Sequence, residues 1–313
     1  MTTTVRDFNI TTFGHDSVYA NGRQQLPISI SLEKRVGGTA VRLSQREIDS
    51  IHILQRVGGP VPGNWSLSVE RNQFSHGLWN RHGRSSDEEI DSSHEEKISD
   101  GVSSIEIFSR YLQCGMPAQS IQIMAAIEIE GLGLITSVGN FGPGMNFTSW
   151  VQVRGVPPFV LNANELISHS EHVHWRSNWA GHQAETWISY WDLPSGLEIK
   201  NQVVTSSSDG QRPRWNGLTE VFNTQRRISV LLDREVQALS VGLIRRDASH
   251  NHYRVPLRSS WRTIRALMDY NNYHASIVMA DRQLWFFVWD NFGCEHRFGI
   301  RQQGNNHFVL SNG

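Results

Sequence analysis

The sequence predicts an all-β protein with little helix, built from tandem antiparallel β-sandwich modules followed by a mixed C-terminal extension. Three observations lead to this fold class. Apolar and polar residues alternate in short runs, glycine and proline separate those runs, and the chain matches itself at a shift of 118 residues. Alternation with a period of two is typical of half-buried strands, and short strands at this spacing favour sandwiches over parallel α/β units.

The strands are expected where the alternation is clearest. In residues 26–32, apolar side chains alternate with polar ones, and Gly37-Gly38 is expected to end the hairpin. Further strands are expected in the first half at 65–69, 105–107, 121–123 and 127–129, and in the second half at 150–153, 228–230 and 239–241. Gly115-Met-Pro117 is interpreted as a turn between two of these strands.

The self-similarity aligns a turn and a strand in each half of the chain. Residues 41–50 fall on 159–168, and residues 119–123 fall on 237–241. A repeat of this length corresponds to one copied domain, so we expect two related modules. The repeat carries no set of acids, bases or nucleophiles that would define a catalytic site.

The module boundary is expected in the glycine-rich segment 139–144, which has the composition of a linker. The predicted domains are therefore a first module over 1–138, a second module over 139–253 and an extension over 254–313. Within the first module, residues 85–100 contain seven acidic residues and one lysine. This run is interpreted as a solvated loop, with calcium or a basic partner as the alternative.

Two segments carry helix signals. Ser44-Gln-Arg-Glu47 has the capping-box pattern, and the residues after it alternate, so one helical turn is expected to run into a strand. In the extension, Trp261, Ile264, Leu267 and Met268 have helical apolar spacing. They predict a helix over about 260–270, followed by a hairpin.

One segment resembles a known family. The run from Val18 to Ile30, with Asn21-Gly22 as a turn before an alternating strand, resembles the opening strand pair of bacterial immunoglobulin-like domains of invasin and intimin type adhesins. The resemblance covers roughly residues 15–55, with a fainter echo at 145–168. It implies a β-sandwich and transfers no functional residues. Adhesin activity is an expectation by analogy only.

Composition narrows the function classes. The 29 basic and 30 acidic residues nearly balance, so no nucleic-acid partner is expected, whereas self-association into homo-oligomers stays open. No apolar run approaches the roughly 20 residues of a transmembrane helix, and the N-terminus lacks a secretory signal pattern. A cytoplasmic location, or export without a classical signal peptide, is therefore expected. Cys114 and Cys294 are interpreted as buried apolar residues, with one long-range disulfide as the alternative.

Tryptophan is unusually frequent, with 11 residues. If a hairpin turns at Gln183, Trp179 faces Trp187 and Trp175 faces Trp191, so that all four lie on one side of the ribbon. Such a ladder either fills a core or forms an exposed platform for sugar rings or a partner surface. The run Trp285-Phe-Phe-Val-Trp289 is apolar on both strand faces, which indicates a central strand or one buried in an interface.

Histidines cluster in residues 169–174. On a strand, His172 and His174 would point to the same face, a spacing that zinc sites use, with His182 or Glu185 across the turn as a third ligand. Surface or partly buried histidines are the alternative. No P-loop, HExxH, GxSxG or CxxC motif occurs, and no cofactor is predicted.

Two classes of function remain open. The first is a non-enzymatic bacterial binding or assembly protein, toxin-like or adhesin-like, that uses aromatic β surfaces on a glycan, a host cell surface or copies of itself. In this class, Trp175, Trp179, Trp187 and Trp191 are the expected ligand-binding residues. The alternative is a metal-dependent or glycan-directed hydrolase that uses the strand carrying His172 and His174.

Overall fold

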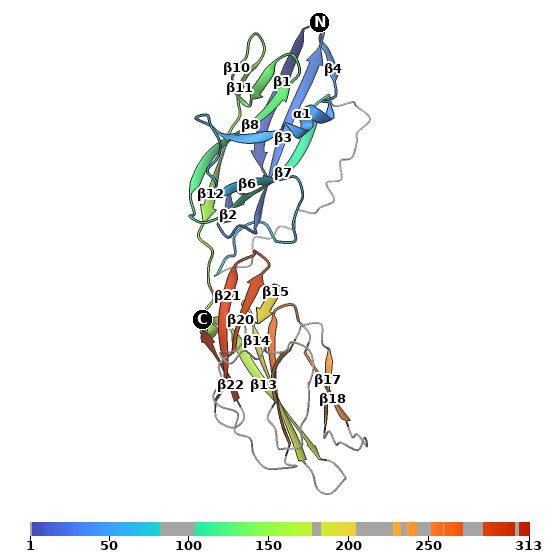
Figure 1. The fold of residues 1–313 in the computed structure, drawn as a ribbon, viewed down its shortest axis with the longest axis vertical. Helices are drawn as coiled ribbons and strands as arrows, with labels where there is room; N and C mark the ends of the chain where they lie inside the picture. The colour runs from blue at the N-terminus through green and yellow to red at the C-terminus, as the bar shows by residue number, and fades with distance from the viewer. Residues whose placement is uncertain are drawn as a thin grey trace. The chain divides into compact units, whose positions relative to one another are not determined.

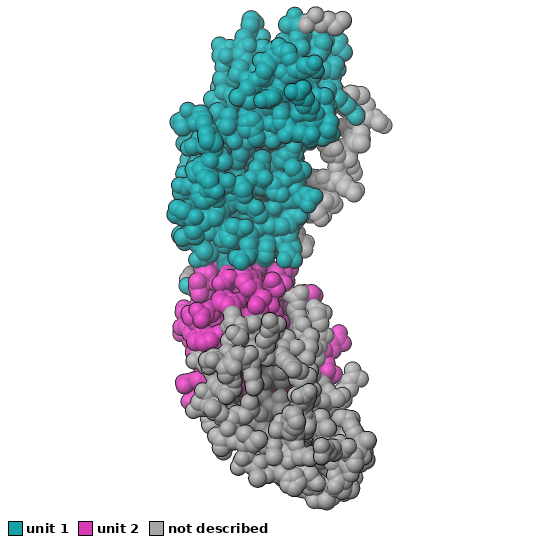
Figure 2. Space-filling view, in the orientation of Figure 1, with its two compact units in different colours: residues 1–158, 292–294 teal, residues 159–291, 295–313 magenta. Residues whose placement is uncertain are grey.

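A computed structural model describes residues 2–81, 104–176, 183–204, 228–232, 237–242, 252–258, 260–271, 284–303 and 307–313. The predicted acidic loop at 85–100 lies outside these ranges. The chain forms two compact units, coloured in Figure 2: unit 1 comprises residues 1–158 and 292–294, and unit 2 comprises residues 159–291 and 295–313. The all-β prediction is confirmed, because strands dominate both units (Figure 1).

Unit 1 is a sandwich of two five-stranded sheets. The first sheet has the order β1-β3-β7-β6, with β4 also pairing with β3; its strands are β1 (Thr3–Thr12), β3 (Gln25–Val36), β4 (Thr39–Val41), β6 (Trp65–Ser68) and β7 (Glu106–Cys114). The second has the order β2-β12-β8-β5, with β9 also pairing with β8; its strands are β2 (Ser17–Tyr19), β5 (His52–Gln55), β8 (Ser120–Ile129), β9 (Gly133–Thr136) and β12 (Val151–Val156). A short ribbon joins β10 (Val138–Asn140) to β11 (Asn146–Thr148).

The alternation in the sequence becomes the core of unit 1. Ile28, Ile30 and Leu32 of β3 are fully buried, while the serines between them are partly exposed. They belong to one apolar cluster with Ile123 and Ile127 of β8, so the two sheets share a single core. The prediction of antiparallel sheets holds with one exception among the described strands, because β2 pairs with β12 in parallel.

The strand β1 forms the edge of the first sheet and carries a bulge. Its pairing with β3 shifts register between Arg6 and Asn9. Within the bulge, Asp7 has a φ of 50°, in the left-handed region that few non-glycine residues adopt. The ladder of hydrogen bonds is therefore interrupted along this edge strand.

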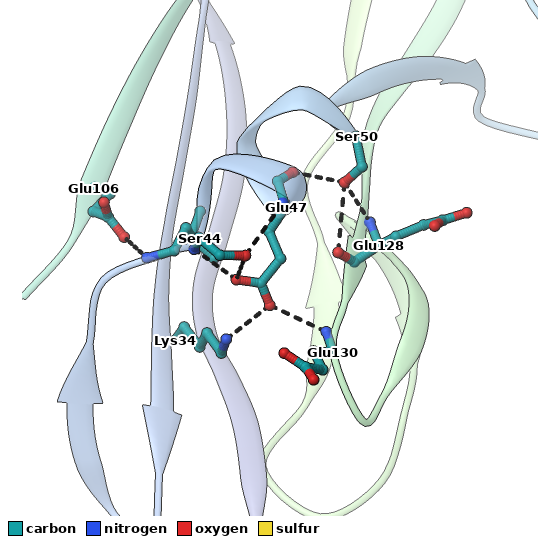
Figure 3. A network of polar contacts seen from close by, with 8 residues as sticks. Lys34, Ser44, Glu47, Ser50, Glu106, Glu128 and Glu130 are labelled. Carbon is teal, nitrogen blue, oxygen red and sulfur yellow. Dashed lines mark hydrogen bonds and ion pairs between the residues drawn. The ribbon is translucent and has the colours of Figure 1, made fainter.

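The predicted helical turn is confirmed as α1 (Gln45–Asp49), which is followed by β5. Its N-cap is Ser44, and the capping box with Glu47 is complete. Glu47 lies at the centre of a polar network (Figure 3): one carboxylate oxygen accepts from Lys34 Nζ at 2.7 Å and from the Glu130 backbone N–H at 3.1 Å. The turn thus links β3 of one sheet to the end of β8 in the other.

Unit 2 contains two four-stranded sheets and a separate hairpin. One sheet has the order β13-β14-β19-β16, with strands β13 (Ile167–Arg176), β14 (Gln183–Asp192), β19 (Thr263–Asn271) and β16 (Ile228–Leu232). The other has the order β15-β20-β21-β22, with strands β15 (Ile199–Val204), β20 (Leu284–Asp290), β21 (Glu295–Gln303) and β22 (His307–Asn312). The hairpin joins β17 (Ala238–Gly242) to β18 (His252–Pro256), and the short 3-10 helix η1 (Ala163–Glu165) precedes β13.

The helix predicted over about 260–270 is wrong, because this segment forms β19. The strand lies between β14 and β16, and the five residues Thr263–Leu267 are all buried. Burial on both faces removes the alternation that identifies a strand. What remains is an apolar spacing that also fits a helix.

The domain boundaries also differ from those predicted. The chain divides at Pro158, and the glycine-rich segment 139–144 forms the β10–β11 hairpin inside unit 1. There Gly142 and Gly144 adopt positive φ, so the glycines serve a tight turn instead of a linker. The predicted extension is not separate either, since β19 pairs with β14 and β20 pairs with β15.

The two segments of the internal repeat have similar turns but different strand partners. The shift places Ser44 and Glu47 on Asn162 and Glu165. In both pairs the glutamate carboxylate accepts the backbone N–H of the N-cap residue, and in the first pair the Ser44 hydroxyl also accepts the Glu47 N–H. After the first turn, β5 pairs with β8, whereas after the second turn β13 pairs with β14. The shift maps β8 onto β17, which pairs with β18. An origin by duplication stays a prediction.

Candidate ligand-binding surface

The tryptophan ladder predicted in the β13–β14 ribbon does not form in the expected register. Trp187 pairs with His172 and Trp191 pairs with Ser168, whereas Trp175 pairs with Ala184. The predicted pairing is wrong because Gln183, Ala184 and Glu185, assigned to the turn, are paired residues of β14. Trp179 lies outside the described residues.

The two described rings of that set are core residues. Trp187 is 7% exposed and Trp191 is 4% exposed. Both lie on β14, which has hydrogen-bonded neighbours on its two sides and is buried on both faces between Thr186 and Trp191. For these two residues the structure agrees with the core alternative, so neither ring offers a surface to a ligand. The side chain of Trp175 is not among those described.

The described contact of the β13 histidines is a ring stack and not a set of metal ligands. The His172 ring is exposed and stacks on Trp187, with ring centroids 4.9 Å apart and planes 6° apart. His174 lies opposite Glu185 in the register, but their side chains are not described. Among the described side chains, no group of three or more His, Cys, Asp or Glu is arranged to hold a metal ion. The metal site stays a prediction.

A different set of aromatic residues does reach the surface. Along β20, buried and partly exposed residues alternate. Phe286, Val288 and Asp290 are buried, whereas Trp285, Phe287 and Trp289 are partly exposed. Residues two apart on a strand share a face, so these three rings form a row on one side of the sheet. We call Trp285, Phe287 and Trp289 the aromatic face. Phe287 and Trp289 stack with centroids 6.1 Å apart and planes 27° apart.

The neighbouring strands frame this row with polar and small residues. On β21, Gly299 lies opposite Trp285, Arg297 opposite Phe287 and Glu295 opposite Trp289. On β15, Val203 lies opposite Phe287 and is 45% exposed. The two strands β20 and β21 run side by side in the orange and red part of Figure 1.

Arg297 is held above the aromatic face. Its guanidinium carbon is 4.8 Å from the centroid of the Trp285 ring and 5.6 Å from that of Phe287. Both distances are within the range of cation–π attraction. The rings therefore fix the position of an exposed cation, and a guanidinium stacked in this way keeps its N–H edges for a ligand.

The aromatic face is rigid because of how β20 is built into the unit. The strand pairs with β15 on one side and β21 on the other. Beneath it, the side chains of His296 and Asp290 are fully buried, and Nε2 of His296 lies 3.0 Å from an Asp290 carboxylate oxygen. Nδ1 of His296 accepts the Leu161 backbone N–H at 3.2 Å. Both ring nitrogens of His296 are thus engaged, and the His296–Asp290 pair ties β21 to β20.

The sequence contains a signal for this surface in the segment that pairs with β20. The prediction of a central strand at 285–289 is confirmed, because β20 pairs on both sides, but the apolar residues on both faces of this run do not show which face is exposed. The partner segment Glu295-His-Arg297-Phe-Gly299-Ile-Arg301 alternates polar and apolar residues. Its polar positions lie on the same side of the sheet as the odd-numbered residues of β20, and they indicate that this side meets solvent.

Comparisons with known proteins give little further information. No protein-family model matches the chain, and no curated protein sequence matches it. Among solved structures, it is similar to the C-terminal domain of the Streptococcus agalactiae AgI/II polypeptide BspA, with 9% identity, a TM-score of 0.22, and coverage of 97% of this chain and 99% of that chain. The C-terminal domain of the Streptococcus pyogenes antigen I/II-family protein AspA gives 9% identity, the same TM-score, and coverage of 97% and 98%.

These neighbours do not bear on the resemblance stated above. A TM-score of 0.22 is too low to show a shared topology, so they carry no conclusion about function. The immunoglobulin-like family suggested by residues 15–55 is not identified among them. None of the helices in the described ranges has the length and hydropathy that crossing a membrane requires.

Proposed function

We propose that this protein is a non-enzymatic, adhesin-like binding module that recognises carbohydrate through the aromatic face of unit 2. The observation that supports this proposal is the row of Trp285, Phe287 and Trp289, partly exposed on a central strand with an arginine stacked above it. Contiguous apolar surface that is left exposed in a soluble domain marks an interaction site more often than a random feature.

The chemistry of the row suits a sugar. A pyranose ring presents C–H groups on one face and hydroxyl groups around its rim, so it can lie on an indole while its hydroxyls meet polar side chains. Arg297 and Glu295 on β21 and Asn201 on β15 border the rings and are exposed. They supply donors and acceptors next to the stacking surface.

The rigidity of the site favours binding. The rings belong to a strand that is hydrogen-bonded on both sides, so little conformational entropy is lost when a ligand docks. Residues two apart along a strand are separated by about 7 Å. The row can therefore contact more than one sugar of a linear glycan.

The test is glycan-array binding followed by calorimetry on the strongest ligand. We expect Trp285→Ala and Trp289→Ala to weaken binding at least tenfold while the protein stays folded. The matched control is Trp150→Ala in unit 1, because Trp150 is also partly exposed and also lies under an arginine, with Arg56 at 4.0 Å. Equal losses in all three variants, or no glycan bound by the wild type, would refute the proposal.

Self-association through the aromatic face is the competing use of the same surface. Light scattering across concentration separates the two. A monomer that binds glycan supports the proposal, whereas a dimer that is lost in Trp285→Ala, without glycan binding, contradicts it. Action as a toxin has no separate observation in its favour.

A further inference from the structure

The end of the aromatic face at Trp285 has features of a subsite for a charged sugar. On β21, the residues on the same side as the aromatic face are Glu295, Arg297, Gly299 and Arg301. Gly299, opposite Trp285, has an arginine two residues before it and another two residues after it. Both arginines are exposed.

We propose that this subsite, formed by Trp285, Arg297 and Arg301, takes an acidic sugar whose carboxylate or sulfate binds the two arginines while its ring packs against Trp285 beside the stacked guanidinium. This inference rests on the proposed function and adds the class of ligand. It follows from the two exposed arginines that lie on the same side of the sheet as the partly exposed Trp285 ring.

Gly299 lies next to the indole in the pairing of β20 with β21 and is itself buried. Strands pair at about 4.8 Å, so any larger side chain at this position would stand beside the Trp285 ring. On the far side of Gly299, β22 places Ser311 in register, and its hydroxyl donates to the Gly299 carbonyl at 3.3 Å. Trp285, Gly299 and Ser311 thus lie side by side across three neighbouring strands.

The charges on this side of the sheet are arranged unevenly. Two arginines flank the row at Trp285, whereas Glu295 lies opposite Trp289 at the other end of the aromatic face. A ligand that carries an anionic group is therefore oriented with that group toward Trp285. The net charge of the whole chain is −1, so a preference for acidic sugars would come from this local pair and not from a general basic field.

Arg297 is suited to hold an anion because it is already positioned. The stacked rings restrain its guanidinium, which lowers the entropy lost when a carboxylate binds two of its N–H groups. Lysine keeps the charge but lacks the planar fork and the stacking surface. Arg297→Lys is therefore expected to retain part of the preference, and Arg297→Gln to lose it.

The experiment compares matched acidic and neutral sugars on the same protein. The probes are oligogalacturonic acid against neutral oligogalactose, and sulfated against desulfated heparin-type oligosaccharides, measured by calorimetry at low and high salt. We expect the wild type to favour the acidic member of one pair by about tenfold to a hundredfold. Arg297→Gln and Arg301→Gln should remove most of that preference, and salt should weaken the acidic ligand more than the neutral one.

The matched control is Arg56→Gln, which removes the arginine stacked on Trp150 in unit 1 and should leave the preference unchanged. Neutral sugars that bind as tightly as acidic ones, with unchanged loss in Trp285→Ala, would overturn this inference and leave the proposed function standing. Failure of every sugar would overturn both. Single-stranded DNA that binds with the same dependence on Trp285 and Arg297 would show that the subsite recognises phosphate in another class of polymer, and would also overturn the inference.

Discussion

The Glu47 network in unit 1 permits a quantitative test of how the sandwich is held together. Glu47 is 3% exposed and pairs with Lys34, which is 11% exposed. One carboxylate oxygen accepts from Lys34 Nζ and from the Glu130 backbone N–H. The other accepts from the Ser44 backbone N–H at 2.8 Å and from its hydroxyl at 2.9 Å. The perturbation is Glu47→Gln, which keeps the shape and replaces one acceptor by a donor.

The expected cost follows from this geometry. Turned one way, the new NH₂ group faces two donors, Lys34 Nζ and the Glu130 N–H; turned the other way, it faces the Ser44 N–H and a hydroxyl that can accept from it. In either orientation Lys34 loses its counter-ion. Leaving a buried donor without its partner costs about 1–3 kcal/mol, and breaking a buried ion pair by removing one member costs about 3–5 kcal/mol. We expect a loss of about 3–5 kcal/mol in the free energy of unfolding of unit 1. For a domain of this size that corresponds to a Tm lower by about 6–20 °C.

Calorimetry measures the Tm, and hydrogen exchange shows whether the loss is confined to α1, β3 and the end of β8. The control is Glu128→Gln, which changes an exposed carboxylate near the same turn (Figure 3) and should alter stability by less than about 0.5 kcal/mol. If Glu47→Gln were as stable as Glu128→Gln, the network would not contribute as reasoned here.

The same network predicts a dependence on pH. Burial raises the pKa of Glu47, but the hydrogen bonds from Lys34, Ser44 and Glu130 lower it more, so its pKa lies below the usual 4.5. A lowered carboxyl pKa contributes stability that is present above the unfolded value and is lost as the pH falls through the folded value. The difference in stability between wild type and Glu47→Gln should thus be constant near neutral pH and shrink below about pH 4. A difference that grows on acidification would contradict the assignment.

Two further predictions concern the region around Cys114. Gly155→Ala should destabilise unit 1 by about 1–3 kcal/mol, because the new Cβ would lie 2.6 Å from Cys114 Sγ and 3.0 Å from the Gln119 carbonyl oxygen. Denaturant unfolding of Gly155→Ala and of Gly155→Ala/Cys114→Ala checks this, and the double variant should recover only part of the loss, because the backbone contact remains. Cys114 and Cys294 are both buried thiols, and burial raises the pKa of Cys114, so a thiol reagent should modify neither in native protein and both after unfolding. Rapid labelling of either thiol in the native protein would disprove the prediction for the two cysteines.

Local patterns in the sequence are sufficient to predict an element where one side of a strand meets solvent or where a short motif contains its own hydrogen bonds. The alternation at 26–32 placed β3 correctly, and Gly37-Gly38 ends it in a turn with positive φ at both glycines. The capping box at Ser44 and Glu47 placed α1 because its chemistry is contained within four residues. In such cases the information that fixes the structure is local.

The same reading failed where a strand is covered on both sides or where pairing decides the outcome. β19 has five consecutive buried residues and was mistaken for a helix. The predicted turn at Gln183 gave the wrong register for β13 on β14, because Gln183, Ala184 and Glu185 are paired residues of β14, which also pairs with β19. The sequence does not reveal the aromatic face, because the exposure of a side chain depends on what packs against β20. Residues 285–289 are all apolar, so the two faces of this strand cannot be distinguished by their polarity.

The bulge in β1 limits how copies of this protein could join. An edge strand with an unbroken row of N–H and C=O groups is a template onto which another chain can add a strand, and this is a common route to fibres. Around Asp7 that row is broken and the backbone turns away from the ladder. Continuous strand addition along the whole of β1 is therefore interrupted at this bulge.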